Sequence, residues 1–179
     1  MKMSEHIKRI KRRVRGLSLL AFYLFTFIPL YLSCSSIDCP VENVVGSIYY
    51  IKNADGTEAT LKDSLSVVSW RKNRTDTLLL NKEAALTSFQ LPMGYANPED
   101  TLVFIVNTTT HNAYKDTLYI KKENHTHFES VDCKIAYFHT VTALRLSSHN
   151  AIDSITIVKP EVNYDLSSEH FHIYFKTWD

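Results

Sequence analysis

The spacing of short β-branched and aromatic runs after residue 34 most constrains how this chain can fold. Clusters of turn-forming residues separate the runs, and no segment beyond residue 34 has a helical hydrophobic period of useful length. Such runs, bounded by Gly, Pro, Asn and Asp, are typical of β-strands. We expect about seven to nine short strands. The segments that fit are Val44–Ile51, Ser64–Trp70, Thr77–Leu80, Leu86–Leu91, Thr101–Asn107, Thr117–Lys121, Ile135–Phe138, Ile152–Val158 and Phe171–Lys176.

Two of these segments predict which way their side chains face. The last one alternates, so Phe171 and Ile173 are expected to face a core while His170 and His172 face solvent. The stretch 101–106 is apolar on both faces, which favours a central strand covered on two sides. We therefore predict an all-β fold, a single β-sandwich with an immunoglobulin-like layout. A small barrel is the alternative.

The tripeptide Asp-Thr-Leu begins at Asp76, Asp100 and Asp116. A repeat architecture would need a fixed period, and these spacings are unequal. We interpret each copy as a local signal, in which Asp closes a turn, Thr enters a strand and Leu is the first core residue.

The first 33 residues indicate an export signal. A basic segment precedes an apolar run, 17–32, that is interrupted by Pro29. This arrangement is typical of a secretory signal. A permanent transmembrane helix is the alternative, but it needs about 20 apolar residues and this run is shorter. The clustered bases are Lys2, Lys8, Arg9, Lys11, Arg12, Arg13 and Arg15.

The end of the run, Tyr31-Leu32-Ser33-Cys34, resembles the lipobox of bacterial lipoprotein signals. Ser33 and Cys34 fit the pattern, whereas Tyr31 stands where an aliphatic residue is usual. The resemblance implies that the sulfur of Cys34 receives a diacylglycerol. We therefore expect a removed signal peptide at 1–33, a lipidated N-terminus and short tether at 34–43, and the β-sandwich domain at 44–179.

Removal of the leader changes the charge of the chain. The leader holds seven of the 20 Lys and Arg residues and one of the 19 Asp and Glu residues, so a whole-chain charge of +1 becomes −5. No basic surface suited to nucleic acid remains.

The remaining cysteines, Cys39 and Cys133, form an even pair in an exported domain, where a disulfide is expected. Two buried free thiols or a reactive nucleophile are the alternatives. Cys39 is only five positions after Cys34, a reach of at most about 17 Å. A disulfide at Cys39 would therefore keep the domain close to the bilayer.

Several segments together resemble a known family. They are Cys39-Pro40, the Asp-Thr-Leu strands, and the segments 132–138, 152–155 and 169–175. The chain is similar to an uncharacterised family of Bacteroidota lipoproteins, the domain of unknown function numbered 6452. Lys134 stands where that family usually has glycine. The resemblance supports the export address and the disulfide, and it implies no catalytic residues because the family has no established activity.

Motifs for catalysis and cofactor binding are missing from the sequence. The glycines after residue 34, Gly46, Gly56 and Gly94, lie too far apart for a phosphate-binding loop. We expect no small-molecule cofactor. Histidines give a weak metal-site hypothesis, because each of two pairs lies on one strand face where a nearby Glu could complete a site. The pairs are His125 with His127 and His170 with His172. The alternative is that these are solvent-facing strand residues.

Aromatic residues give a second weak hypothesis. Trp70, Tyr95 and Tyr114 could form a ligand platform, although such residues more often fill a core or cover a sheet edge. The leading expectation is a non-enzymatic accessory lipoprotein that binds another envelope protein. Its lipid anchor would hold it at the periplasmic face of the outer membrane, because residues 35–38 lack a run of acids. The alternatives are a surface glycan-binding module and a metal-dependent hydrolase that uses the histidines.

Overall fold

Strands make up most of the described chain, which in the computed structural model comprises residues 23, 39, 44–71, 75–108 and 112–177. The chain divides into two units, Met1–Asp38 and Cys39–Asp179. The strands belong to the second unit. They are β1 (Gly46–Ile51), β2 (Ser64–Ser69), β3 (Thr77–Glu83), β4 (Ser88–Pro92), β5 (Glu99–Asn107), β6 (Ala113–His127), β7 (Ala136–Leu146), β8 (Ile152–Ile157), β9 (Glu161–Val162) and β10 (Phe171–Phe175).

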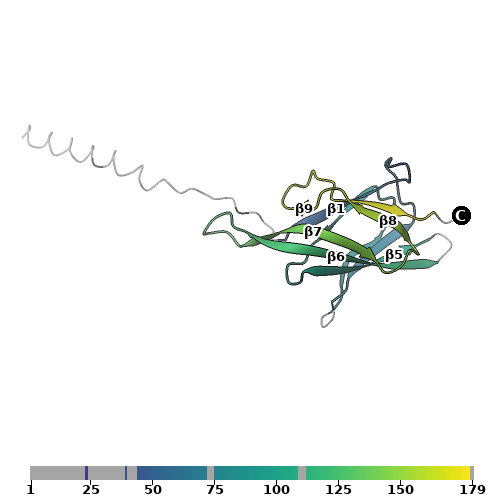
Figure 1. Cartoon of the computed structure of the whole chain (residues 1–179), viewed down its shortest axis with the longest axis horizontal. Coiled ribbons are helices and arrows are strands. Elements are labelled where there is room, and N and C mark those ends of the chain that lie inside the picture. The colour runs from purple at the N-terminus through teal and green to yellow at the C-terminus, as the bar shows by residue number, and fades with distance from the viewer. Residues whose placement is uncertain (1–22, 24–38, 40–43, 72–74, 109–111, 178–179) are drawn as a thin grey trace, which may run out of the picture. The chain divides into compact units, whose positions relative to one another are not determined.

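Two sheets face each other. The smaller has the order β4-β1-β10-β8 and the larger has the order β3-β2-β5-β6-β7-β9. Figure 1 shows them as two layers, with β1 and β8 in one and β5 and β6 in the other. Strands β1 and β10 are parallel, and the other pairs of named strands are antiparallel. The predicted all-β sandwich is confirmed, with more strands than the seven of a constant-type immunoglobulin domain.

The core lies between the sheets and is built by alternation along the strands. Leu102, Phe104 and Val106 of β5 are buried, whereas the residues between them are only partly covered. An aromatic cluster joins the two layers, because the ring of Tyr49 stacks on Phe89 with centroids 4.9 Å apart and contacts Phe104 at 6.3 Å. Burial of such large rings supplies much of the energy that holds two sheets together.

Each predicted strand segment overlaps a strand of the structure, but several bounds and lengths differ. Strands β6 and β7 continue far beyond the predicted segments, through the polar stretch 122–127 and its partner residues on β7. The short strand β9 was not predicted. The second face of β5 is only partly covered, whereas the sequence predicted cover on both faces.

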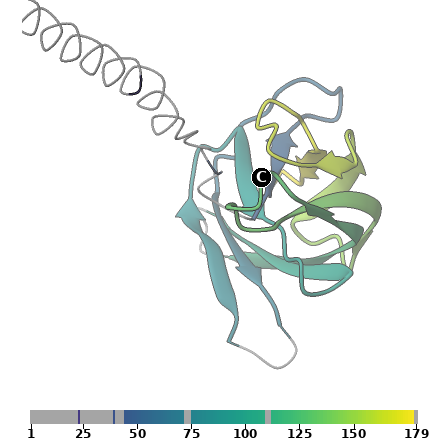
Figure 2. The same cartoon turned by 90° about the vertical axis from the view of Figure 1, so that its left-hand side faces the viewer.

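Strand β3 forms one border of the larger sheet. Figure 2 shows the β2–β3 hairpin projecting from the sandwich. Leu102 and Leu118 of the Asp-Thr-Leu copies are core residues, as predicted, but Leu78 is 53% exposed. The reason is register, since Leu78 pairs with Val68 on the outer face of the sheet, whereas Leu80 pairs with the buried Val67. Among the described residues, no helix is long and apolar enough to span a membrane.

Candidate functional site

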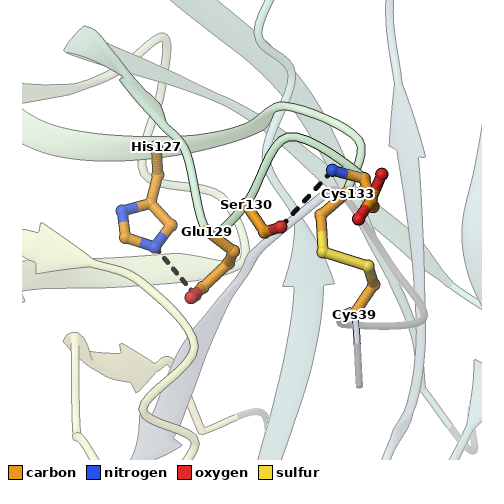
Figure 3. The surroundings of a disulfide bond; sticks show 6 residues. Cys39, His127, Glu129, Ser130 and Cys133 are labelled. Atoms are coloured by element: carbon orange, nitrogen blue, oxygen red, sulfur yellow. Dashed lines mark hydrogen bonds and ion pairs between the residues drawn. A yellow bond between two sulfur atoms is a disulfide. The ribbon is translucent and has the colours of Figure 1, made fainter. Parts of the chain in front are cut away.

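The predicted disulfide between Cys39 and Cys133 is present. It joins residues 94 positions apart, with an S–S distance of 2.05 Å and a Cα–Cα distance of 5.4 Å (Figure 3). Cys133 lies in the turn between β6 and β7. Close by, Val44 forms an isolated parallel bridge with Tyr137 of β7. Bond and bridge together attach the start of the domain to the β6–β7 hairpin. Cys34 lies outside the described residues.

Backbone and side-chain hydrogen bonds shape this turn. The backbone N–H of Cys133 donates to the carbonyl of Ser130 at 3.2 Å (Figure 3). The N–H of Asp132 donates to the hydroxyl of Ser130 at 3.4 Å. Val131 and Asp132 therefore occupy the two central positions of a four-residue turn. We call the segment Phe128–Ile135 the β6–β7 turn.

Apolar side chains project from the β6–β7 turn. Val131 is 85% exposed, Phe128 is 59% exposed and Ile135 is 47% exposed. Isolated exposed apolar residues are common on proteins. Here three of them lie within one short turn, beside the disulfide.

Aromatic contacts support the turn from the adjoining ends of the strands. The ring of His127 stacks on Phe138 with centroids 4.2 Å apart, and the edge of Tyr164 packs against Phe138 at 5.0 Å. Nε2 of His127 is 2.8 Å from a carboxylate oxygen of Glu129 (Figure 3). These contacts fix the last residues of β6 before the turn begins.

A second aromatic pair covers the same end of the hairpin. Tyr95, from the β4–β5 connection, stacks on Tyr137 with ring centroids 4.5 Å apart and an angle of 8° between the ring planes. The side-chain amide of Asn124 donates to the carbonyl of Tyr95 at 3.0 Å and so fixes the connection to β6. Tyr95 remains 48% exposed.

Beneath this surface lies a buried polar cluster. Oδ1 of Asn124 is 2.7 Å from Nδ1 of His139, which therefore carries the proton that Asn124 accepts. The ammonium of Lys122 forms an ion pair with Asp100 at 2.9 Å, with its side chain fully buried. Burial, together with the positive charge of Lys122, lowers the pKa of His139 from 6.5 to about 4. The imidazole is consequently neutral at neutral pH.

The weak metal candidates do not come together. His125 and His127 are on β6 of the larger sheet, whereas His170 and His172 belong to the β10 region of the smaller sheet. Nε2 of His125 contacts the hydroxyl of Thr140 at 3.1 Å, and Nε2 of His172 contacts Glu169 at 2.6 Å. In the part of the chain that the structure describes, no group of three or more His, Cys, Asp or Glu side chains could hold a metal ion.

The predicted outward orientation of His170 is wrong. Its side chain is fully buried, and the backbone N–H of Ile48 donates to its Nδ1 at 3.1 Å. His170 precedes β10, and its carbonyl accepts hydrogen bonds from the N–H groups of Val158 and Lys159. The connection from β8 to β9 therefore folds over a position that strand alternation alone would expose.

The aromatics predicted as a platform lie apart. The backbone N–H of Trp70 donates a hydrogen bond to the carbonyl of Thr101, and Thr101 pairs with Tyr119 of β6. Tyr114 lies five residues from Tyr119 along β6, and Asn124, the partner of Tyr95, lies five residues the other way. At about 3.3 Å per residue, the three positions along β6 that lie next to these aromatic residues are spaced about 17 Å apart. Tyr114 also packs against the core.

Two buried polar groups were missed by the sequence interpretation. Asp116 was taken for an ordinary turn residue, yet its carboxylate accepts hydrogen bonds from the N–H groups of Asn150, Ala151 and Ile152. Lys122 was not singled out. The alternation of buried Leu118 and Ile120 would place it on the inner face and could have identified it.

These features define a disulfide-bonded, two-sheet β-sandwich domain with an exposed apolar turn beside the disulfide. The chain belongs to the family of unknown function DUF6452, whose model matches residues 64–175. The match runs from β2 to β10 and includes Cys133. No curated protein and no solved structure matches the chain.

Proposed function

We propose that this protein is a non-enzymatic lipoprotein of the cell envelope whose β-sandwich binds another envelope protein. The observation that carries the proposal is the pairing of the cysteines. The chain has three, and the bond between Cys39 and Cys133 leaves Cys34 as the single one. Cys34 directly follows the basic and apolar leader, which is where a lipid-bearing cysteine stands.

In this proposal the lipid anchor holds the protein at the membrane and the sandwich binds the partner. One acyl chain binds a membrane weakly and reversibly, whereas several hold a protein there stably. Confinement to the membrane raises the effective concentration of the domain near other envelope proteins. The absence of an acidic run at residues 35–38 favours the periplasmic face of the outer membrane.

Exposed residues near β3 support the protein-binding part of the proposal. Trp70 is 48% exposed and Leu78 is 53% exposed. Val68 pairs with Leu78 on one side and with Val103 on the other, so these side chains form a row across the sheet. Border strands with apolar residues can also accept a strand from a partner.

The anchor is tested by replacing Cys34→Ala and analysing the protein from cells by mass spectrometry. The parent should begin at Cys34 and carry fatty acids, because the thioether forms on this sulfur. The variant should accumulate with its leader attached and without lipid. Ser35→Ala is the matched control and should be processed normally. Retention of the leader on the parent protein, or acylation of the Cys34→Ala variant, would refute the lipoprotein assignment.

The partner is tested by photo-crosslinking from position 78 in intact cells. A reproducible adduct with one envelope protein is expected, because this side chain is exposed on the border strand. A crosslinker at buried Val67 of neighbouring β2 is the control and should give no such adduct. Repeated failure to recover any partner from gently solubilised membranes, together with no adduct at position 78, would argue against protein binding.

A further inference from the structure

We propose that the β6–β7 turn contacts the lipid surface of the membrane that holds the anchor. The inference rests on the proposed acylation of Cys34 and adds a second membrane contact to it. Its ligand is the boundary between phospholipid headgroups and acyl chains. The residues that would enter this boundary are Phe128, Val131 and Ile135, which are all exposed in the turn.

Covalent geometry brings this turn to the bilayer. Cys34 and Cys39 are five residues apart, so the chain between them reaches at most about 17 Å. The disulfide fixes Cys39 to Cys133. Val131 is two residues from Cys133, at most about 7 Å along the chain. The backbone at Cys34 and the tip of the turn therefore stay within about 30 Å of each other in any conformation of the tether.

The chemistry of the turn suits shallow insertion. Val131 stands at the tip of a turn whose backbone is held by Ser130, so it is presented to solvent without ordering of a loop on binding. Glu129 is paired with His127, while Asp132 and Lys134 are exposed charges. Charged groups stay in the headgroup layer, so they limit the depth that the apolar side chains reach.

The aromatic pair behind the turn fits the same boundary. Tyr137 pairs with Thr126 of β6, directly before the turn, and Tyr95 stacks on it. Tyrosine rings collect at membrane–water boundaries because they combine an apolar ring with a polar hydroxyl. The half-exposed ring of Tyr95 would lie on the headgroups when Val131 enters the bilayer.

The exposed apolar residue of β3, Leu78, is too distant to share this contact. Leu78 belongs to a row that reaches Thr117 of β6 through Val68 and Val103. Thr117 is ten residues from His127, about 33 Å along the strand. The short tether therefore favours the β6–β7 turn as the lipid contact, and the row around Leu78 remains available for a protein partner.

The test uses the full-length acylated protein in phosphatidylcholine vesicles that contain a photoactivatable phosphatidylcholine. Mass spectrometry first verifies the acyl chains, and lipid adducts are then mapped to peptides. Adducts are expected on the peptide that contains Phe128 to Ile135 and not on β3. Val131→Asp should lower the adducts on the turn by about fivefold, because a charge replaces the apolar side chain at the tip. Leu78→Asp is the matched control and should leave them unchanged.

Each outcome decides the proposal. Acylated protein without adducts on the turn would overturn the lipid contact and leave the anchor standing. Protein that carries no fatty acid would remove the anchor and this inference together. A photoreactive residue at position 131 that crosslinks in cells to one protein and to no lipid would assign the turn to a protein partner and overturn the proposal.

Discussion

At the scale of single residues, Asp116 joins three parts of the sandwich. It begins the core segment of β6, and its carboxylate accepts hydrogen bonds from the N–H groups of Ala151 and Ile152 at 2.7 Å each and from the hydroxyl of Ser148 at 2.6 Å. Burial raises the pKa of this carboxyl, but the hydrogen bonds outweigh burial and the net pKa is lowered. Stability from Asp116 is therefore present above its ordinary pKa and lost as the pH falls through the lowered value.

Replacement of Asp116→Ala should lower the free energy of unfolding by about 3 kcal/mol, because several buried N–H groups lose their acceptor. Urea unfolding followed by circular dichroism measures the loss. Asp55→Ala is the matched control, since Asp55 also accepts from a backbone N–H and a hydroxyl, both of Thr57, but at the surface. Equal losses for the two variants would show that burial of the Asp116 network contributes nothing.

His139 is a second buried group whose protonation state affects stability. Its Nδ1 donates to Asn124, and its buried Nε2 has no hydrogen-bond partner among the described residues. Burial lowers the pKa to about 4, so the folded protein keeps the ring neutral at pH values where the unfolded chain already binds a proton. Folding stability should therefore fall as the pH drops from 6.5 toward about 4.

Over that interval His139 should account for a loss of about 2.5 kcal/mol in the free energy of unfolding. His139→Gln should flatten the pH dependence without abolishing it, because burial also lowers the pKa of His170. Urea unfolding at a series of pH values gives the slope. The control is His149→Gln, at an exposed position. An unchanged slope in the His139→Gln variant would contradict the assignment.

At the scale of elements, the sequence predicts the strands better than their lengths. Alternating apolar residues such as Leu118 and Ile120 identify the part of β6 that faces the core. The following residues, 122–127, are polar on both faces and carry no such signal. They are nevertheless in a strand because β7 supplies their backbone hydrogen-bond partners, and that pairing depends on tertiary register.

The same limit explains the errors at individual sites. The burial of His170 comes from the connection between β8 and β9, which no local pattern specifies. Trp70, Tyr95 and Tyr114 could be chosen as aromatic residues, but their separation along β6 depends on register. The disulfide could be predicted because the proposed export signal and the proposed lipid on Cys34 leave Cys39 and Cys133 as an even pair, for which a disulfide is favoured over free thiols.

At the scale of the whole molecule, the disulfide has two separable effects. It joins residues 94 positions apart, and this closed loop lowers the conformational entropy of the unfolded chain. It also sets the length of the proposed tether. Without the bond, the next attachment after Cys34 within the described residues is the bridge between Val44 and Tyr137, ten residues away. The maximum reach then doubles from about 17 Å to about 34 Å.

The double variant Cys39→Ser, Cys133→Ser should therefore change both stability and membrane contact. The free energy of unfolding should fall by about 3 kcal/mol, measured in urea. With Cys34 still acylated, lipid adducts on the β6–β7 turn should fall by about threefold, because a longer tether lowers the effective concentration of the turn at the bilayer surface. Asp116→Ala is the control, since it destabilises the domain but keeps the short tether and should retain its adducts. If both variants lose adducts equally, destabilisation and not tether length controls the contact.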